Sequence, residues 1–299
     1  MPKANNRERQ SLFNAAPLPV AMLNDAERLA CLRLIRSENV GPVTFRELIN
    51  HYGGAAPALE ALPDLAARGG NKRRIRITSK SEGERELERA RKSGAKPIFT
   101  IEPGYPPALA SIEAPPPLLY VRGDAAVLTR PAVAIVGSRQ ASAAGHKLTR
   151  QFASGLGEAG YVVVSGHARG IDAVRRLAKA DADRAVAGAL ERVSDAVAHE
   201  MTLDTGTIAV VAGGVDIIYP PENAALTQAI AEKGAIVSDM PPGFQPRAKD
   251  FQRRNRIISG ISLGVLVIEA AKRSGTLVTA RLAGEQGREV FAVPGHPLD

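Results

Sequence analysis

The stretch AVAIVGSRQAS, residues 132–142, decides the expected fold. It opens with five small or β-branched apolar residues, a run too short for a helix but typical of a buried strand. The run ends in Gly137, Ser138 and Arg139, and the segment that follows, 141–158, has helical periodicity. A strand, a glycine turn and a helix in this order form the first half of a βαβ unit.

The same alternation continues to the end of the chain. It predicts an α/β fold: a doubly wound, mostly parallel Rossmann-like sheet with helices on both faces. The predicted strands are 132–136, 162–164, 207–211, 235–237, 263–268 and 289–293, and the predicted helices are 141–158, 172–203, 222–233, 253–259 and 276–286.

The chain before residue 132 has a different character. A helical pattern starts at Asn24, breaks at 39–42, and resumes until Gly53. Helix, glycine-containing hairpin and helix are typical of a SAM-like or helix-hairpin-helix unit. Such a hairpin either offers backbone amides to a phosphate or is only a packing module, and the sequence leaves both open.

A charged surface helix is predicted over 79–93, ended by Gly94, and a proline-rich passage follows. Its prolines exclude a central strand at Leu118–Val121 but allow edge strands and extended loops. The expected organisation is a flexible tail (1–20), a helical SAM-like domain (21–76) and an extended Rossmann-like domain (77–299).

Composition narrows the class of partner. The 299 residues carry a formal net charge of +8, which favours a polyanionic ligand such as nucleic acid. The single cysteine, Cys31, excludes an internal disulfide, and no apolar run reaches the ~18 residues that cross a bilayer. With no signal-peptide pattern at the amino terminus, the expectation is a cytoplasmic protein.

Glycine, serine and basic residues follow several predicted strands. Because the carboxyl ends of parallel strands share one edge of the sheet, these turns are candidate phosphate sites. The densest signal is 247–256, with five basic residues and one acid. Within it, Phe251 could stack on a base, and Asn255 could bond a base edge or orient the arginines.

Catalytic patterns are weak. The five histidines show no metal-ligand spacing, and neither a Walker A loop nor a G-x-S-x-G elbow occurs. The turn after residue 136 lacks the G-x-G-x-x-G spacing of dinucleotide enzymes. Glu269 could be a general base, but capping a helix or bracing a loop is the favoured role. No cofactor and no metal are expected.

Six motifs together resemble the DNA-processing protein A family (DprA, also called Smf). They are Ala134–Arg139, Val164–Asp172, Tyr219–Asn223, Arg253–Gly260, Ser274–Ala280 and Gly287–Gly295. The helical first unit is similar to the SAM-like domain that precedes the Rossmann-like domain in many members.

The resemblance implies a protein that is not an enzyme. Members of the family bind single-stranded DNA without strong sequence preference, load RecA recombinase onto it during natural transformation, and form homodimers. The resemblance and the strand-end turns together nominate as DNA-binding residues Gly137, Ser138, Arg139, Ser165, Gly166, Arg169, Gly170, Lys249, Phe251, Arg253, Arg254, Asn255, Arg256, Ser274, Gly275 and Thr276.

Three features depart from the family pattern. An insertion is expected over about 175–197, His167 stands where leucine is common, and the chain stops at Asp299 without the expected next helix or a winged-helix domain. The last departure leaves dimerisation open.

Two other functions remain as alternatives. Cytokinin-activating phosphoribohydrolases share the Rossmann-like topology, but their Pro-Gly-Gly-x-Gly-Thr-x-x-Glu motif is missing at 212–216. A plain nucleotide or dinucleotide carrier would require saturable binding of a mononucleotide.

Overall fold

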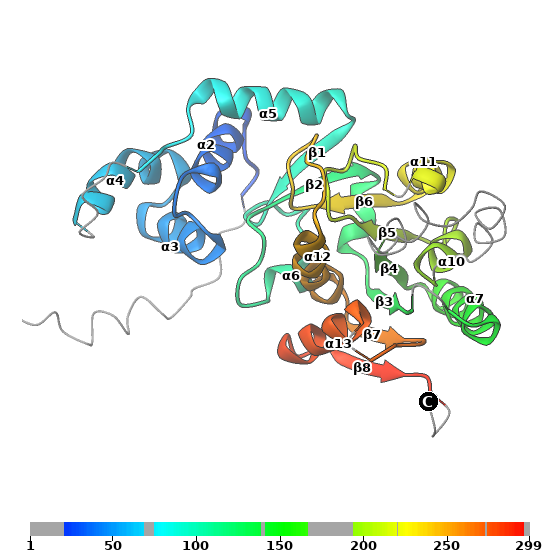
Figure 1. Cartoon of the computed structure of the whole chain (residues 1–299). Coiled ribbons are helices and arrows are strands. Elements are labelled where there is room, and N and C mark those ends of the chain that lie inside the picture. The colour runs from blue at the N-terminus through cyan, green and yellow to red at the C-terminus, as the bar shows by residue number, and fades with distance from the viewer. Residues whose placement is uncertain are drawn as a thin grey trace, which may run out of the picture. The chain divides into compact units, whose positions relative to one another are not determined.

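The computed structural model describes residues 21–68, 75–138, 141–166, 194–219, 221–272 and 274–295 (Figure 1). The chain folds into two compact units. Unit 1 comprises Met1–Glu88, Ile98–Pro103 and Glu113–Leu118, and unit 2 comprises Arg89–Pro97, Gly104–Ile112 and Leu119–Asp299.

Unit 1 is built around helices α2 (Asp25–Arg36), α3 (Pro42–Tyr52), α4 (Ala55–Arg68) and most of α5 (Lys80–Lys92). The predicted helix pair is confirmed. Asn24 caps α2, because its side chain accepts the Glu27 amide at 3.0 Å while the Glu27 carboxylate accepts the Asn24 amide at 2.7 Å. Gly53 ends α3 with φ of 74°, a conformation that glycine adopts without strain.

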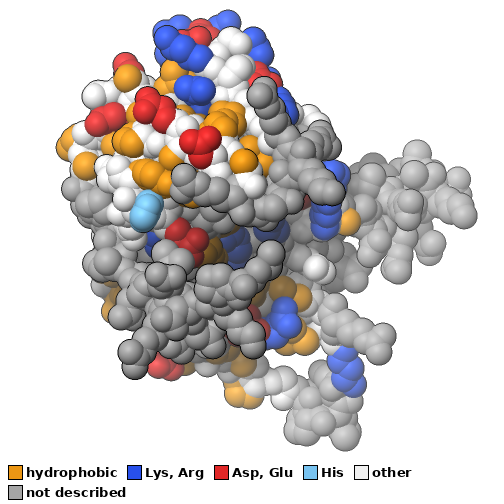
Figure 2. Space-filling model, turned by 90° about the vertical axis from the view of Figure 1, so that its left-hand side faces the viewer, with side chains coloured by type: hydrophobic (Ala, Val, Ile, Leu, Met, Phe, Trp, Pro, Cys, Tyr) orange, Lys and Arg blue, Asp and Glu red, His pale blue; other side chains and the backbone are white. Residues whose placement is uncertain are grey.

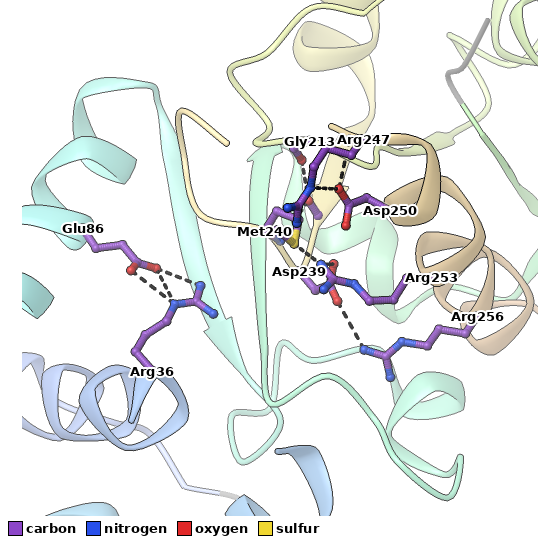
Figure 3. A network of polar contacts seen from close by, with 10 residues as sticks. Arg36, Glu86, Gly213, Asp239, Met240, Arg247, Asp250, Arg253 and Arg256 are labelled. Atoms are coloured by element: carbon purple, nitrogen blue, oxygen red, sulfur yellow. Dashed lines mark hydrogen bonds and ion pairs between the residues drawn. The ribbon is translucent and has the colours of Figure 1, made fainter. Parts of the chain in front are cut away.

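Helix α5 is less of a surface helix than its charge suggests. Arg36 of α2 forms a forked ion pair with the largely buried Glu86 of α5, with N–O distances of 2.8 to 3.2 Å (Figure 3). A side chain at Gly83 would lie 2.7 Å from Leu29, so glycine allows α5 to approach α2 closely. Its exposed residues are mainly basic, and lysine and arginine gather at the top of Figure 2, at the level of α5.

Eight strands form one sheet. In order across the sheet they are β1 (Ala95–Phe99), β2 (Leu118–Gly123), β6 (Ala235–Ser238), β5 (Thr207–Val210), β4 (Val162–Gly166), β3 (Ala132–Val136), β7 (Gly264–Val267) and β8 (Glu289–Ala292). From β6 to β8 every pair is parallel, and β2 is antiparallel to β6. All six strands predicted from residue 132 onward are present.

The prediction that the prolines exclude a central strand at Leu118–Val121 is wrong. Strand β2 is second in the sheet and β1 covers its outer side. The prolines at 115–117 end just before β2, so they remove no hydrogen bond from it. Strand β1, at the edge, is the one that contains a proline, Pro97.

Helices cover both faces of the sheet, which confirms the doubly wound prediction (Figure 1). On one face lie α7 (Ala143–Glu158), α10 (Ser194–Met201) and α11 (Ala224–Lys233). On the other lie α12 (Ala248–Ile261), α13 (Gly275–Glu285) and the short α6 (Pro107–Ala110). Of the two short 3-10 helices, η1 (Ala125–Thr129) lies between β2 and β3, and η2 (Pro221–Asn223) lies directly before α11.

Helix α12 differs most from its predicted bounds. Helix α12 begins at Ala248 rather than at residue 253, because the Asp250 carboxylate accepts the Arg247 amide and stabilises an earlier first turn. Of the predicted helix 172–203, only α10 falls within the described residues. None of the helices in the described ranges is long and apolar enough to cross a lipid bilayer.

Candidate nucleic-acid interface

The strand order reverses at the carboxyl end of β3. The chain runs from β3 outward to β4, β5 and β6, and then returns to β7 on the other side of β3. In open α/β sheets, ligands bind outside the carboxyl ends of the strands where the order reverses in this way. Gly137 and Ser138 follow β3 at this point and are half-buried.

A carboxylate from another part of the chain, that of Glu269, lies at the start of α7. Ser142 caps this helix, and Glu269, just after β7, accepts the Ser142 amide at 2.9 Å and the Ser142 hydroxyl. A side chain at Gly145 would lie 2.6 Å from the Glu269 carboxylate. Of the two roles favoured for Glu269, capping a helix or bracing a loop, the structure shows bracing, because Glu269 holds the N-cap residue Ser142. Its charge occupies part of the place predicted for a phosphate.

Hydrogen bonds connect the predicted residues on α12, α13 and β3. The Asn255 amide donates to the Gly275 carbonyl at 3.2 Å, and the Thr276 hydroxyl donates to the Gly137 carbonyl at 2.9 Å. Ser274 is the N-cap of α13. The motifs after β3 and β7 and the motif on α12 are therefore brought together.

A second group surrounds the end of β4. The buried Ser165 hydroxyl lies 2.6 Å from the Ile135 carbonyl and 2.9 Å from the Asp195 carboxylate. Arg254 is only 4% exposed, and its guanidinium donates to the Val210 carbonyl at the end of β5. The group includes Gly166, which is buried.

Helix α12 has a buried face and a cationic face. Phe251 is 9% exposed and packs against Ala212 and Tyr219, with ring centroids 5.8 Å apart. On the exposed side, Lys249 is open to solvent and the Arg253 side chain is 45% exposed. Four residues apart on a helix, these two side chains are neighbours.

The cationic face has an acidic neighbour that the sequence reasoning missed. Asp239 follows β6 directly, and its carboxylate lies 3.2 Å from Arg256 and 3.7 Å from Arg253 (Figure 3). Arg253 also contacts the Met240 sulfur. The position of Asp239 in the sequence could have indicated this contact, because an acid that follows a parallel strand lies at the same edge of the sheet as the predicted turns.

A second acid, Asp250, orders the start of α12. Burial by itself would raise its pKa. Two hydrogen bonds, from the Arg247 amide at 2.9 Å and the Arg247 side chain at 3.2 Å, act in the opposite direction, as do the positive charges of Arg247 and Arg253, and together they outweigh burial. The pKa of Asp250 therefore lies below its usual 3.8. Its carboxylate holds Arg247 in place beside the cationic face (Figure 3).

The turn after β5 is filled by the segment before α12. The Gly214 amide donates to the Phe244 carbonyl at 2.9 Å, and Asp216 accepts the Gly243 amide at 2.9 Å. A side chain at Gly213 would meet Phe244 and Pro246 at 2.9 Å. This turn therefore has a connecting role in the described structure.

Several predicted residues lie outside the described residues. They are Arg139, Arg169 and Gly170, together with His167, Asp172 and most of the predicted insertion. Among the residues that the structure does describe, no three His, Cys, Asp or Glu side chains gather so that they could hold a metal ion. For the whole nominated set, contact with DNA stays a prediction.

Family models match both parts of the chain. The model for DNA recombination-mediator protein A matches residues 96–193 and 180–299, and the model for the DprA-like N-terminal HHH domain matches residues 25–89. The chain belongs to the DNA recombination-mediator protein A family. The two matched parts overlap within the stretch predicted as an insertion.

Relatives in this family are similar over most of the chain. Protein Smf of Synechocystis sp. is 33% identical over 284 residues, which cover 91% of this chain and 66% of the relative. Protein Smf of Escherichia coli is 43% identical over 194 residues, which cover 64% and 46%. The chain thus spans less than two thirds of the length of these curated relatives.

Two solved structures share the fold. DNA processing protein A from Streptococcus pneumoniae matches with a TM-score of 0.62 and 27% identity, over 99% of this chain and 89% of the other. DNA processing protein A from Helicobacter pylori, studied for its single-stranded DNA binding mode, matches with a TM-score of 0.56 and 29% identity. That match covers 68% of this chain and 82% of the other.

Proposed function

We propose that unit 2 binds single-stranded DNA along the carboxyl edge of its parallel sheet, without strong sequence preference and without catalysis. The observation that carries the proposal is the cationic face of α12, formed by Lys249, Arg253 and Arg256. The hydrogen bonds of Asn255 and Thr276 hold this helix beside the glycine turn after β3.

Phosphate contacts supply most of the affinity in this proposal. Lysine and arginine gain affinity by releasing the counterions condensed on nucleic acid, and this gain is independent of base sequence. Aromatic residues make up 4% of the chain and Phe251 is packed against Tyr219, so few rings are open for base stacking.

Family membership supports a role in recombination for the bound single-stranded DNA. The family is named for recombination mediation, and the Helicobacter pylori relative binds single-stranded DNA. We therefore propose that the chain, as a homodimer in the cytoplasm, loads RecA recombinase onto single strands during natural transformation. RecA filament growth on oligo-dT, measured with and without the chain, tests this part: the chain should shorten the lag, and an unchanged lag would contradict RecA loading.

The central experiment measures oligo-dT binding between about 50 and 200 mM salt. If the chain neutralises several phosphates, the logarithm of the binding constant falls with the logarithm of salt by ~0.7 per phosphate. Binding of single strands should exceed binding of the matched duplex. A salt-independent constant, or hydrolysis of AMP measured in parallel, would refute the proposal.

A pair of variants locates the interface. Arg253→Gln removes one exposed cation from the cationic face and should reduce the salt slope by ~0.7. Arg281→Gln is the matched control, because this α13 residue is 69% exposed and pairs with Glu285 within its own helix. Equal slopes for both variants and the unchanged chain would remove α12 from the interface.

A further inference from the structure

Arg254 differs from its neighbours in the basic run. Arg253 and Arg256 have side chains 45% and 22% exposed, whereas Arg254 is almost fully covered. One position along a helix turns the side chain by about 100°, so Arg254 faces the sheet while Arg253 faces outward. Its guanidinium donates to the Val210 carbonyl, the last residue of β5.

The end of β4 leaves room for this guanidinium. A side chain at Gly166 would lie 2.5 Å from Arg254 Nη1 and 2.8 Å from Asp195 Oδ2. Arg254, on α12, and Asp195, on α10, thus both border the space beside Gly166, and their helices lie on opposite faces of the sheet. Asp195 also accepts the Ser165 hydroxyl at 2.9 Å, so its carboxylate is held to β4 as well.

From this geometry we infer that Arg254 and Asp195 form a clasp beside Gly166 that positions the DNA-binding edge, and that Arg254 is not a phosphate ligand. The inference rests on the proposed function of unit 2. The clasp joins the ends of β4 and β5 to α12, which carries the cationic face on its other side. Arg254 is buried, bound to the Val210 carbonyl and beside the Asp195 carboxylate, so few alternative positions would leave its charge satisfied.

The roles of ligand and clasp predict opposite effects of Asp195→Asn. If Arg254 bound phosphate, loss of the neighbouring carboxylate would increase the local positive charge and strengthen DNA binding. If the pair is a clasp, the same change loosens the edge and weakens binding, roughly tenfold, within the range typical of coupling between two sites. Arg254→Gln should weaken binding by a similar factor.

The salt slope gives a second, independent readout. A lost phosphate contact lowers the slope by ~0.7, whereas a positioning residue leaves the number of neutralised phosphates unchanged. The double variant Asp195→Asn/Arg254→Gln should bind about as well as either single variant, since both remove the same clasp. Arg253→Gln is the matched control, for which a smaller slope is expected.

The experiment is an oligo-dT titration of the full chain and these variants over a salt series, with thermal melting to show that each is folded. Weaker binding at an unchanged slope, without additivity, supports the clasp. Tighter binding by Asp195→Asn, or a slope reduced by Arg254→Gln, would overturn it. So would folded variants with unchanged affinity, which would make the pair only structural.

Arg254→Lys keeps the positive charge but loses the forked donors of the guanidinium group. It provides a milder test should the glutamine variant fail to fold. It should bind more weakly than the unchanged chain at the same slope, and unchanged affinity would again refute the clasp. Absence of oligo-dT binding by the unchanged chain would refute the proposed function itself, a result distinct from any variant effect.

Discussion

Replacing Asp239 by asparagine should strengthen DNA binding and make it more sensitive to salt. The Asp239 carboxylate is 12% exposed and lies 3.2 Å from Arg256 and 3.7 Å from Arg253, so it neutralises part of the cationic face (Figure 3). In the variant, both guanidinium groups lose this acidic neighbour, and Arg256, which lies nearer to it, adds a phosphate contact to the one proposed for Arg253.

The size of the effect follows from the number of cations released. Each additional phosphate contact steepens the salt slope by ~0.7. Over a fourfold change in salt, from about 50 to 200 mM, this one contact adds roughly a 2.6-fold loss of affinity.

The assay is fluorescence anisotropy of labelled oligo-dT at several salt concentrations. Asp204→Asn is the matched control: it removes an exposed carboxylate that pairs with Lys233 at 2.6 Å. Asp204 lies just before β5, at the amino ends of the strands, and its removal should change neither affinity nor slope. Weaker binding by Asp239→Asn at an unchanged slope would show that Asp239 orients the arginines rather than neutralising them.

Three further predictions concern stability and reactivity. Burial first, then nearby acids, raises the pKa of Cys31 to about 12, so the native chain should react with Ellman's reagent at pH 8 far more slowly than the unfolded chain. The pKa of Asp250 is lowered from 3.8 in the folded state, so its contribution to stability is complete above that pH and is lost as pH falls through the lowered value. Asp250→Asn should therefore flatten the acid side of the stability curve in chemical unfolding. Gly145→Ala places a Cβ 2.6 Å from Glu269 Oε1, and the disturbed helix cap should cost about 1 kcal/mol.

Each of these has a result that contradicts it. Rapid modification of native Cys31 would show that its thiol is accessible, and an unchanged acid side would show that Asp250 is not stabilised as a carboxylate. Gly155→Ala is the control for Gly145→Ala, because it lies in the same helix and a Cβ there meets nothing within 4 Å. It should be neutral or stabilising, and equal effects of the two substitutions would exclude a contact with Glu269 as the cause.

Most of the fold was predictable because its signals are local. A run such as 132–136 carries enough buried apolar surface to identify a strand without knowledge of its neighbours. The position of β2 in the sheet was not predictable, because the prolines before it do not indicate which strand pairs with its outer edge. The early start of α12 depends on Asp250 accepting the Arg247 amide, a contact that strand and helix periodicity do not contain.

The amino-acid sequence by itself determined the α/β class, the excess of positive charge and the concentration of arginine at 247–256. The sequence does not distinguish the roles of Arg253 and Arg254, because both belong to the same basic run. Only the tertiary structure separated them, because the rotation of α12 turns Arg254 into the space left by Gly166 and leaves Arg253 facing solvent. The side chain that can reach a phosphate is decided by packing between helix and sheet, and that packing depends on residues far apart in the chain.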